Sequence, residues 1–157
     1  VVNLWDALTL TIPLKQLQDS PIFFSMSRFQ IRKLILLMVS QKNNSGDVIV
    51  EEGSQGSEMF IIINGRATVT KAHQTGFEIL SELDVGDVIG EIGYLNRGKR
   101  RRTASVIASS DIELLRLSSD VTAELLRFYP RIASQFNFNI ARILGDRLGT
   151  TNELLTS

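Results

Sequence analysis

The stretch between Gly46 and about Leu117 restricts the fold more than any other feature of the chain, because it consists of short apolar runs separated by turn residues. The runs are rich in Val, Ile and Phe, and breaks that contain glycine or aspartate separate them: "DVIVEE", "EMFIII", "RATVTKA", "FEILSEL", "DVIGEI", "TASVIA" and "DIELLRL". Many short strands without intervening helices are typical of an antiparallel sandwich, jelly roll or barrel. Between two of the runs, Asn64 and Gly65 predict a hairpin turn, since both residues tolerate positive φ.

Helical periodicity precedes this stretch. Ser27 and Gln30 have the spacing of a capping box, in which each side chain satisfies a free backbone donor of the first helical turn. An apolar stripe at i, i+3, i+4 and i+7 follows: Ile31, Leu34, Ile35 and Met38. We expect this helix to end at the turn residues "QKNNSG".

Helical periodicity also returns after the stretch. Two serines at 118–119 predict the start of a short helix that runs to Arg127, and Pro130 suits the first turn of a longer helix. The longer helix carries one apolar stripe: Ile132, Phe136, Ile140, Ile143, Leu144 and Leu148. We therefore expect a mainly β fold with flanking α-helices: an antiparallel sandwich, jelly roll or barrel with N-terminal helices and two C-terminal helices.

The expected boundaries follow from these changes of period. We expect an N-terminal helical extension at 1–20, one domain at 21–149 and a tail at 150–157. Within the domain, the β-core takes about 46–117 and the C-terminal helices take 118–149. A chain of 157 residues is long enough for one domain with its own core.

Composition narrows the class of protein. The chain has no cysteine, which excludes a disulfide scaffold and cysteine-based zinc sites and fits a reducing compartment. The longest apolar run, "LILLMV" at 34–39, is too short to span a bilayer, and no signal-peptide pattern precedes the first helix. We expect a cytoplasmic protein without a membrane segment. The 17 basic and 17 acidic residues balance, which argues against a general polyanion binder.

The segment "GEIGYLNRGKRRRTAS", from Gly90 to Ser105, contains the charged residues that best suit a ligand-binding site. Glu91 has apolar neighbours, and a carboxylate is costly to bury unless it is paired or hydrogen-bonded. The residues at 92–95 can form one helical turn, whose free N–H groups suit an anion. A basic run follows, and arginine grips two phosphate oxygens with its planar fork. The combination suits a ligand that carries both hydroxyls and a phosphate.

Three stretches in order resemble the cyclic-nucleotide-binding domain family, which includes catabolite activator proteins, protein kinase A regulatory subunits and cyclic-nucleotide-gated channels. They are "EEGSQGSEMFIIINGRATV" with its glycines in register, "DVGDVIGEIGYL" leading into the phosphate-binding cassette, and "RTASV" at the end of the cassette. The resemblance covers roughly residues 21–149 and is closest to the channel versions at "RTASV". It implies an antiparallel β jelly roll (double-stranded β-helix) with N-terminal helices and two C-terminal helices. It also implies a ligand-controlled regulatory module, which we take to be a stand-alone bacterial member.

The resemblance also implies roles for individual residues. Glu91 would accept a hydrogen bond from the ribose 2′-hydroxyl, and Arg102 would pair with the cyclic phosphate. Gly90 and Gly93 would let the backbone close around ribose and phosphate, with the Gly93 N–H donating to the phosphate, and Thr103 would contribute its N–H and its hydroxyl. Neighbours expected to line the ligand are Ile89, Ile92 and Ala104. The final helix would close over the base as a lid, with these candidates: Ile143, Leu144, Arg147 and Leu148.

The cassette leaves two arginines as candidates for the phosphate. The loop is about two residues longer than in the family members compared with it, so counting forward from Glu91 selects Arg100, whereas counting back from "TAS" selects Arg102. We favour Arg102, with the extra residues bulging earlier in a solvated "NRGKR" loop. For the base we favour cAMP over cGMP, because bacterial members commonly bind cAMP, although a threonine after the cassette arginine is often associated with guanine.

Other functions fit the sequence less well. Enzymatic metal chemistry needs clustered ligands, and the chain has the single histidine His73 and no cysteine, so we expect neither an enzyme nor a metal site. The alternative function is a nucleic-acid-binding or protein-interaction β-sandwich that uses the basic loop at 97–102; for nucleic acid, the lack of interleaved aromatics in this loop argues against the role. Only a short tail follows Gly149, so we expect no DNA-binding domain. The apolar stripe of the final helix suits docking of a second subunit, which predicts a homodimer.

Overall fold

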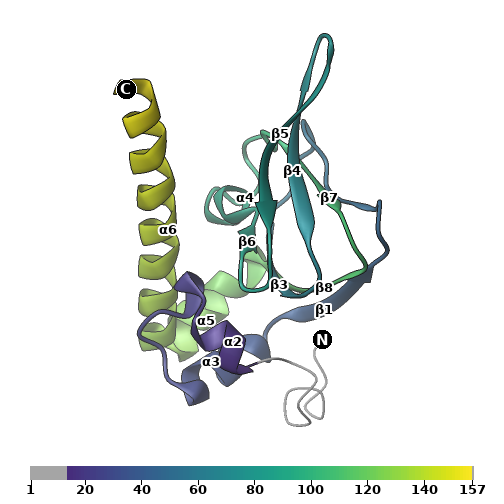
Figure 1. Cartoon of the computed structure of the whole chain (residues 1–157). Coiled ribbons are helices and arrows are strands. Elements are labelled where there is room, and N and C mark those ends of the chain that lie inside the picture. The colour runs from purple at the N-terminus through teal and green to yellow at the C-terminus, as the bar shows by residue number, and fades with distance from the viewer. Residues whose placement is uncertain (1–13, 157) are drawn as a thin grey trace.

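The computed structural model describes residues 14–156 of the chain (Figure 1). The first part of the expected helical extension, residues 1–13, lies outside the described residues, and its last part forms helix α2 (Leu14–Gln18). A 3-10 turn, η1 (Pro21–Phe23), comes next and is capped by Ser20. The Ser20 hydroxyl also donates to the carbonyl of Gly86 at 2.5 Å, which ties the start of the domain to the β-core.

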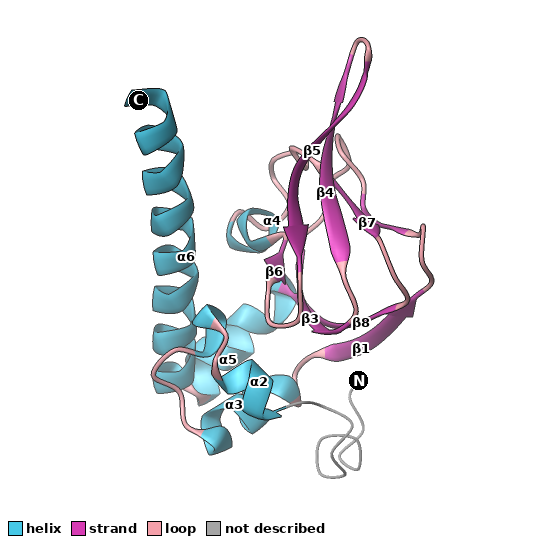
Figure 2. Cartoon of the chain, viewed as in Figure 1, coloured by secondary structure: helices cyan, strands magenta, loops and turns pink. Residues whose placement is uncertain are grey.

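Two four-stranded antiparallel sheets form the β-core, and this confirms the predicted mainly β fold (Figure 2). One sheet, which we call the inner sheet, has the strand order β1-β8-β3-β6, and the other, the outer sheet, has the order β2-β7-β4-β5. The strands are β1 (Val39–Asn43), β2 (Val48–Val50), β3 (Glu58–Asn64), β4 (Ala67–His73), β5 (Gly76–Leu83), β6 (Val88–Ile89), β7 (Ser105–Ala108) and β8 (Ile112–Ser118).

Strands β3, β6 and β8 of the inner sheet contribute to a core on each face, because helices cover one face and the outer sheet covers the other (Figure 1). Strand β3 shows this arrangement: Met59 and Ile61 belong to the core under the helices, whereas Phe60 and Ile62 belong to the core between the sheets. A strand that is buried on both faces needs apolar residues at successive positions. The run "MFIII" therefore follows from the layer that β3 occupies.

The first flanking helix begins where the sequence predicts, whereas the segment predicted to start a short helix at Ser118 and Ser119 begins as a 3-10 turn. Helix α3 (Arg28–Ile35) has a complete capping box, with Gln30 N–H donating to Ser27 Oγ at 3.2 Å and Ser27 N–H donating to Gln30 Oε1 at 3.0 Å. After the β-core, the side chain of Ser118 caps a 3-10 turn, η2 (Ser119–Val121).

Two longer elements complete the helical layer. Helix α5 (Thr122–Phe128) follows η2, and helix α6 (Pro130–Thr156) begins at Pro130. Helix α6 packs against α5 and η1 and stands alongside the β-core (Figure 1). Of its predicted stripe, Ile132, Phe136 and Ile140 are buried.

The predicted start of the β-core is wrong. Helix α3 ends at Ile35, and the residues at 39–43, which were expected to end that helix and enter a turn, form strand β1. Strand β1 pairs with β8 along its whole length, from Val39 opposite Arg116 to Asn43 opposite Ile112. These pairings across the chain outweigh the local turn preference of "QKNNSG", whose last residues make the turn between β1 and β2. The β-core therefore begins at Val39 rather than at about 46.

The predicted hairpin at Asn64 and Gly65 is also wrong. Gly65 has the expected positive φ of 89°, but the strands that this turn joins lie in different sheets and do not pair. The true hairpin joins β4 to β5, where His73 pairs with Gly76 across a two-residue loop. A turn signal fixes the local backbone, whereas burial of both faces of β3 decides which strands it pairs with.

The expected tail is wrong as well, because α6 continues through residues 150–156. Gly149 does not end the helix, since one glycine in a helix interior costs only about 1 kcal/mol and "NELL" contains good helix formers. Among the described residues, no helix is both long and apolar enough to cross a membrane.

Asn139 joins α6 to the beginning of the domain. Its side chain is fully buried, and its Nδ2 donates to the carbonyls of Ile22 and Phe24, each at 2.9 Å. The Asn139 Oδ1 accepts from Gln135 at 3.0 Å, so both ends of the amide have partners. The polar contact therefore holds η1 on α6 inside an otherwise apolar core.

Asn139→Ala should lower the free energy of unfolding by about 1–3 kcal/mol, because the buried carbonyl of Ile22 and the partly buried carbonyl of Phe24 lose their donor. Urea unfolding followed by circular dichroism measures the change. Asn137→Ala is the matched control, since it makes the same substitution at a partly exposed position of α6, and we expect an effect within about 0.5 kcal/mol. Equal losses in the two variants would contradict a special role for Asn139.

Candidate functional site

A cavity of about 720 Å³ opens where β5, β6, α4 (Glu91–Leu95), β7 and α6 meet, which is a common size for a small-molecule site. Its apolar wall comes mainly from the sheets: Val50, Val69, Leu80, Leu83, Val88, Ile89 and Val106. Its polar lining is made by charged and hydroxyl side chains of α4, the cassette and α6: Glu91, Arg100, Arg101, Arg102, Thr103, Asp146 and Arg147.

Most of the predicted ligand residues lie together in this cavity: Ile89, Gly90, Glu91, Ile92, Gly93, Arg102, Thr103, Ala104 and Arg147. Three of the predicted lid residues do not line it. Ile143 and Leu144 pack against the core under the helices, and Leu148 is 62% exposed. Of the four lid candidates on α6, the cavity therefore includes Arg147 alone.

Helix α4 begins directly after β6, and Gly90 makes the turn between them. Its φ of 76° is in the left-handed region, which favours glycine. A side chain at this position would also lie 2.9 Å from the carbonyl oxygen of Glu58. Both constraints place the first residue of the helix, Glu91, at the edge of the cavity.

The guanidinium of Arg102 is held by backbone carbonyls of two different segments. Its side chain is 8% exposed. Nη1 donates to the carbonyl of Gly90 at 3.2 Å, and Nη2 donates to the carbonyl of Glu58 at 2.8 Å. The Glu58 carboxylate lies 3.8 Å from Nη2. Contacts within the protein therefore hold the Arg102 guanidinium in one orientation.

Three glycines make room for this guanidinium. A Cβ on Gly56 would lie 2.7 Å from Arg102 Nη2, and a Cβ on Gly90 would lie 2.6 Å from Nη1. A Cβ on Gly93 would collide with Nη1 and would lie 2.6 Å from the carbonyl oxygen of Gly56. The glycines that the sequence places on both sides of the cassette thus share one neighbour, Arg102.

Burial lowers the pKa of the Arg102 guanidinium, and the carboxylates of Glu58 and Glu91 oppose this shift. Arginine has so high a pKa that it keeps its charge at neutral pH. Arg102 lies in the wall between the main cavity and a smaller cavity of about 320 Å³ that Glu51 and Glu58 also line. It is therefore a buried cation beside a cavity, with room for an anion next to it.

Glu91 is 4% exposed, and its carboxylate is paired with a side chain from α6. Arg147 Nη1 donates to Glu91 Oε1, and Arg147 Nη2 donates to the carbonyl of Val88 at 3.3 Å. The two residues are 56 positions apart in the chain. One arginine of α6 thus reaches the end of β6 and the start of α4.

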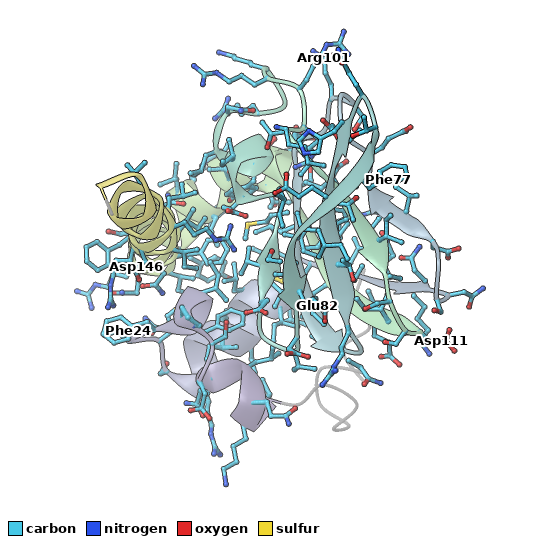
Figure 3. All side chains as sticks on the ribbon, turned by 45° about the horizontal axis from the view of Figure 1, so that its top comes forward. Phe24, Phe77, Glu82, Arg101, Asp111 and Asp146 are labelled. Atoms are coloured by element: carbon cyan, nitrogen blue, oxygen red, sulfur yellow. The ribbon has the colours of Figure 1, made fainter. Side chains whose placement is uncertain are left out.

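The rest of the basic run faces solvent: Arg97, Lys99, Arg100 and Arg101. The chain bends away after α4, with positive φ at Arg97 (56°) and Gly98 (72°). Arg101 lies at the end of the β-core that is far from Phe24 (Figure 3), where its Nη1 donates to the carbonyl of Gly53 at 2.7 Å. Arg102 is thus the member of the run whose side chain turns inward.

Tyr94 connects α4 to the two C-terminal helices. Its hydroxyl accepts from Thr122 Oγ1 of α5 at 2.9 Å, and its ring meets Phe136 of α6 edge-on, with centroids 6.3 Å apart. Burial raises the pKa of the Tyr94 hydroxyl, and the hydrogen bond from Thr122 partly offsets the rise. A displacement of α4 would therefore change its contacts with α5 and α6 directly.

A family model for the cyclic nucleotide-binding domain matches residues 41–129, which is more than half of the chain. The chain belongs to the cyclic-nucleotide-binding domain family. This confirms the resemblance drawn from the glycine-punctuated strands and the cassette.

Relatives from two protein classes match the chain. It is 33% identical over 103 residues to the cAMP-dependent protein kinase regulatory subunit of Mycosarcoma maydis, covering 66% of this chain and 20% of that protein. It is 34% identical over 130 residues to cyclic nucleotide-gated channel beta-3 of Canis lupus familiaris, covering 82% of this chain and 16% of that protein. The chain therefore spans a fifth or less of the length of these relatives.

Solved structures of the family share the fold. The Thermus thermophilus catabolite activator protein matches with a TM-score of 0.78 at 25% identity, covering 87% of this chain and 62% of that chain. The structure of cAMP-bound PfPKA-R (141–441) matches with a TM-score of 0.68 at 23% identity, covering 92% of this chain and 45% of that chain. These matches confirm the predicted jelly roll.

Sequence reasoning missed several residues of the cyclic-nucleotide-binding domain's cavity. Leu80 and Ser81 of β5 and Asp146 of α6 all line it. Asp146 precedes the predicted Arg147, so a search for charged residues near the lid could have found it, whereas nothing in the local pattern of β5 indicates which residues face the cavity. Within the described part of the chain, no group of three His, Cys, Asp or Glu residues is arranged to hold a metal ion.

Gly93→Ala should lower the free energy of unfolding by about 1–3 kcal/mol, because the added methyl group collides with the Arg102 guanidinium and the Gly56 carbonyl. Gly145→Ala is the matched control, since a Cβ there meets nothing within 4 Å and the residue lies inside α6. We expect that variant to gain about 0.5–1 kcal/mol from better helix propensity. Thermal unfolding of both variants tests the difference, and a neutral Gly93→Ala would contradict the proposed crowding around Arg102.

Proposed function

We propose that the chain is a regulatory module that binds a cyclic nucleotide, with cAMP favoured over cGMP, in the 720 Å³ cavity between Glu91 and Arg102. The observation that carries the proposal is the guanidinium of Arg102, which is buried, pre-oriented by two carbonyls and turned toward the cavity. The structural likeness to cAMP-bound PfPKA-R supports cAMP as the ligand.

Arg102 would bind the cyclic phosphate. Two of its nitrogens are held by carbonyls, so the side chain loses little conformational entropy when an anion arrives. Arg100 is the alternative raised by the loop length, but its side chain is exposed and would have to be ordered on binding. Gly93 and Thr103 also line the cavity, where their backbone N–H groups would add donors.

Glu91 would accept the ribose hydroxyl. Its carboxylate lies at the cavity edge at the start of α4, and a carboxylate is the strongest side-chain acceptor for a hydroxyl. The apolar wall of the outer sheet, with Val69 and Leu83, would contact the base and the sugar. The module would then read charge at one end of the ligand and hydroxyls at the other.

Ligand binding would reach α5 and α6 through α4. The Tyr94 contacts with Thr122 and Phe136 provide the route, because the cassette helix and the C-terminal helices share them. Any difference in these contacts between the empty and the occupied domain supplies the coupling free energy. A homodimer through the C-terminal helix and a cytoplasmic location stay predictions.

Arg102→Ala should weaken cAMP binding by about 2–5 kcal/mol, as expected when one partner of a buried charge pair is removed. Arg100→Ala and Arg101→Ala are the controls, with losses under about 1 kcal/mol because their side chains are exposed. Isothermal titration calorimetry with cAMP and cGMP measures all three, after circular dichroism has shown that each variant is folded.

Arg102→Lys separates the effect of the positive charge from that of the planar guanidinium. Lysine keeps the charge but cannot make two parallel hydrogen bonds to the phosphate. An intermediate loss for this variant would support the bidentate contact. A larger loss for Arg100→Ala than for Arg102→Ala would instead assign the phosphate to Arg100, and no binding of either nucleotide to the wild type would overturn the proposed function.

A further inference from the structure

We propose that the Thr103 hydroxyl is a phosphorylation site for a Ser/Thr protein kinase that selects basic sequences, and that a phosphate there closes the cavity to the ligand. The closing of the cavity rests on the proposed function, whereas the modification itself does not. Three features of the molecule carry the inference: the arginines before Thr103, the exposure of its side chain and the cations around it.

The arginines before Thr103 form a charge pattern that a kinase can read. All three positions before the hydroxyl are arginines, in the run "RRRTA". Arg100 and Arg101 are exposed, as is Thr103, and Arg101 reaches the surface of the β-core (Figure 3). Kinases select substrates by charge pattern, and guanidiniums pair strongly with carboxylates in a substrate groove. The loop therefore presents an acceptor hydroxyl together with two accessible charges upstream of it.

The neighbouring hydroxyl, that of Ser105, lacks these advantages. Ser105 lies in β7, and its Oγ accepts from the N–H of Glu52 at 2.9 Å. The arginine three positions before Ser105 is Arg102, whose side chain is only 8% exposed. An inward-facing guanidinium cannot enter the groove of another protein. Exposure therefore favours Thr103 over Ser105 as the acceptor.

A kinase binds its substrate as an extended segment, so residues 101–103 have to leave their neighbours at 53–55. The Arg102 N–H donates to the carbonyl of Ser54 at 2.7 Å, and the Gly53 N–H donates to the carbonyl of Arg102 at 2.8 Å. None of these residues belongs to the two apolar cores. Openings that break a few hydrogen bonds near the surface cost much less than global unfolding. The segment can therefore reach a kinase while the domain stays folded.

The reaction is the transfer of the γ-phosphoryl group of ATP. A bond forms between Thr103 Oγ1 and the γ-phosphorus, and the bond from that phosphorus to the oxygen bridging to the β-phosphorus breaks. ADP leaves with the bridging oxygen, and the hydroxyl proton passes to a carboxylate of the kinase. The Thr103 side chain gains about 1.5–2 negative charges at pH 7.

Cations surround the position of the new phosphate. Lys71 Nζ donates to the carbonyl of Thr103 at 3.3 Å. Thr103 lines the cavity together with Arg100, Arg101 and Arg102. A phosphate on Thr103 would pair with these side chains through charge-assisted hydrogen bonds. It would occupy the cations that the cyclic phosphate needs, and its own charge would repel that phosphate.

Incubation of the full chain with ATP and the catalytic subunit of cAMP-dependent protein kinase, a kinase that prefers upstream arginines, tests the modification. Mass spectrometry should locate the phosphate at Thr103, and Thr103→Ala should remove it. The double variant Arg100→Ala/Arg101→Ala should be modified at least about tenfold more slowly, because two charge pairs with the kinase are lost. The matched control Arg97→Ala/Lys99→Ala removes two exposed charges from the same loop and should stay within about threefold.

Calorimetry with cAMP tests the closing of the cavity. The phosphorylated chain should bind cAMP at least about tenfold more weakly than the unmodified chain, because like charges meet at one site. Removal of the phosphate by a phosphatase should restore the affinity. In the reverse direction, saturating cAMP should slow the modification of Thr103, since a ligand held by Arg102 opposes opening of the segment.

Four results would overturn parts of the inference. Absence of phosphate at Thr103, or its appearance at Ser105 instead, overturns the modification. Equal slowing in the two double variants rules out recognition through Arg100 and Arg101. A phosphate on Thr103 that leaves the cAMP affinity unchanged overturns the closing of the cavity. If the unmodified chain binds no cyclic nucleotide while Thr103 is phosphorylated, the proposed function falls and the modification stands.

Discussion

A buried guanidinium group needs hydrogen-bond acceptors, and the site depends on how the chain supplies them to Arg102. The acceptors are the carbonyls of Gly90 and Glu58, which come from the end of β6 and the start of β3. Backbone can approach a guanidinium this closely only without side chains in between, which explains the glycines at 56, 90 and 93. One side chain thus accounts for the spacing of glycines on both sides of the cassette.

The order of the layers in the fold places Arg102 and its carbonyl acceptors next to the helices. The inner sheet carries β6 between the helical core and the core between the sheets, so that Val88 faces one and Ile89 faces the other. Helix α4 leaves the edge of that sheet and meets α5 and α6 through Tyr94. A ligand in the cavity therefore touches a segment that the C-terminal helices also touch, and no separate transmission element is needed.

The sequence predicted those features that depend on local pattern. The capping box at Ser27, the helix start at Pro130 and the antiparallel strands all follow from short-range rules, and the structure has each of them. The errors at β1 and at Asn64 have a common cause, because both depend on which strands pair across the fold. A short stretch of sequence does not reveal which strand it will pair with, since strand pairing depends on burial of the whole sheet.

The candidate site likewise has a part that local sequence predicted and a part that depends on contacts between distant residues. The cassette residues from Ile89 to Gly93 and from Arg102 to Ala104 are contiguous in sequence, so the family pattern located them together. The pairing of Glu91 with Arg147 joins positions 56 residues apart, and no periodicity or motif links them. The expectation of an apolar lid was reasonable from the stripe on α6, but that stripe is largely used to pack the helix. Two charged residues of α6, Asp146 and Arg147, line the cavity instead.

A crystal structure of the domain grown with cAMP tests the central claim most directly. The account predicts one ligand in the cavity, with its cyclic phosphate on the guanidinium of Arg102 and its ribose hydroxyl within hydrogen-bonding distance of Glu91. A phosphate bound by Arg100 in the exposed loop, or a ligand outside this cavity, would contradict it.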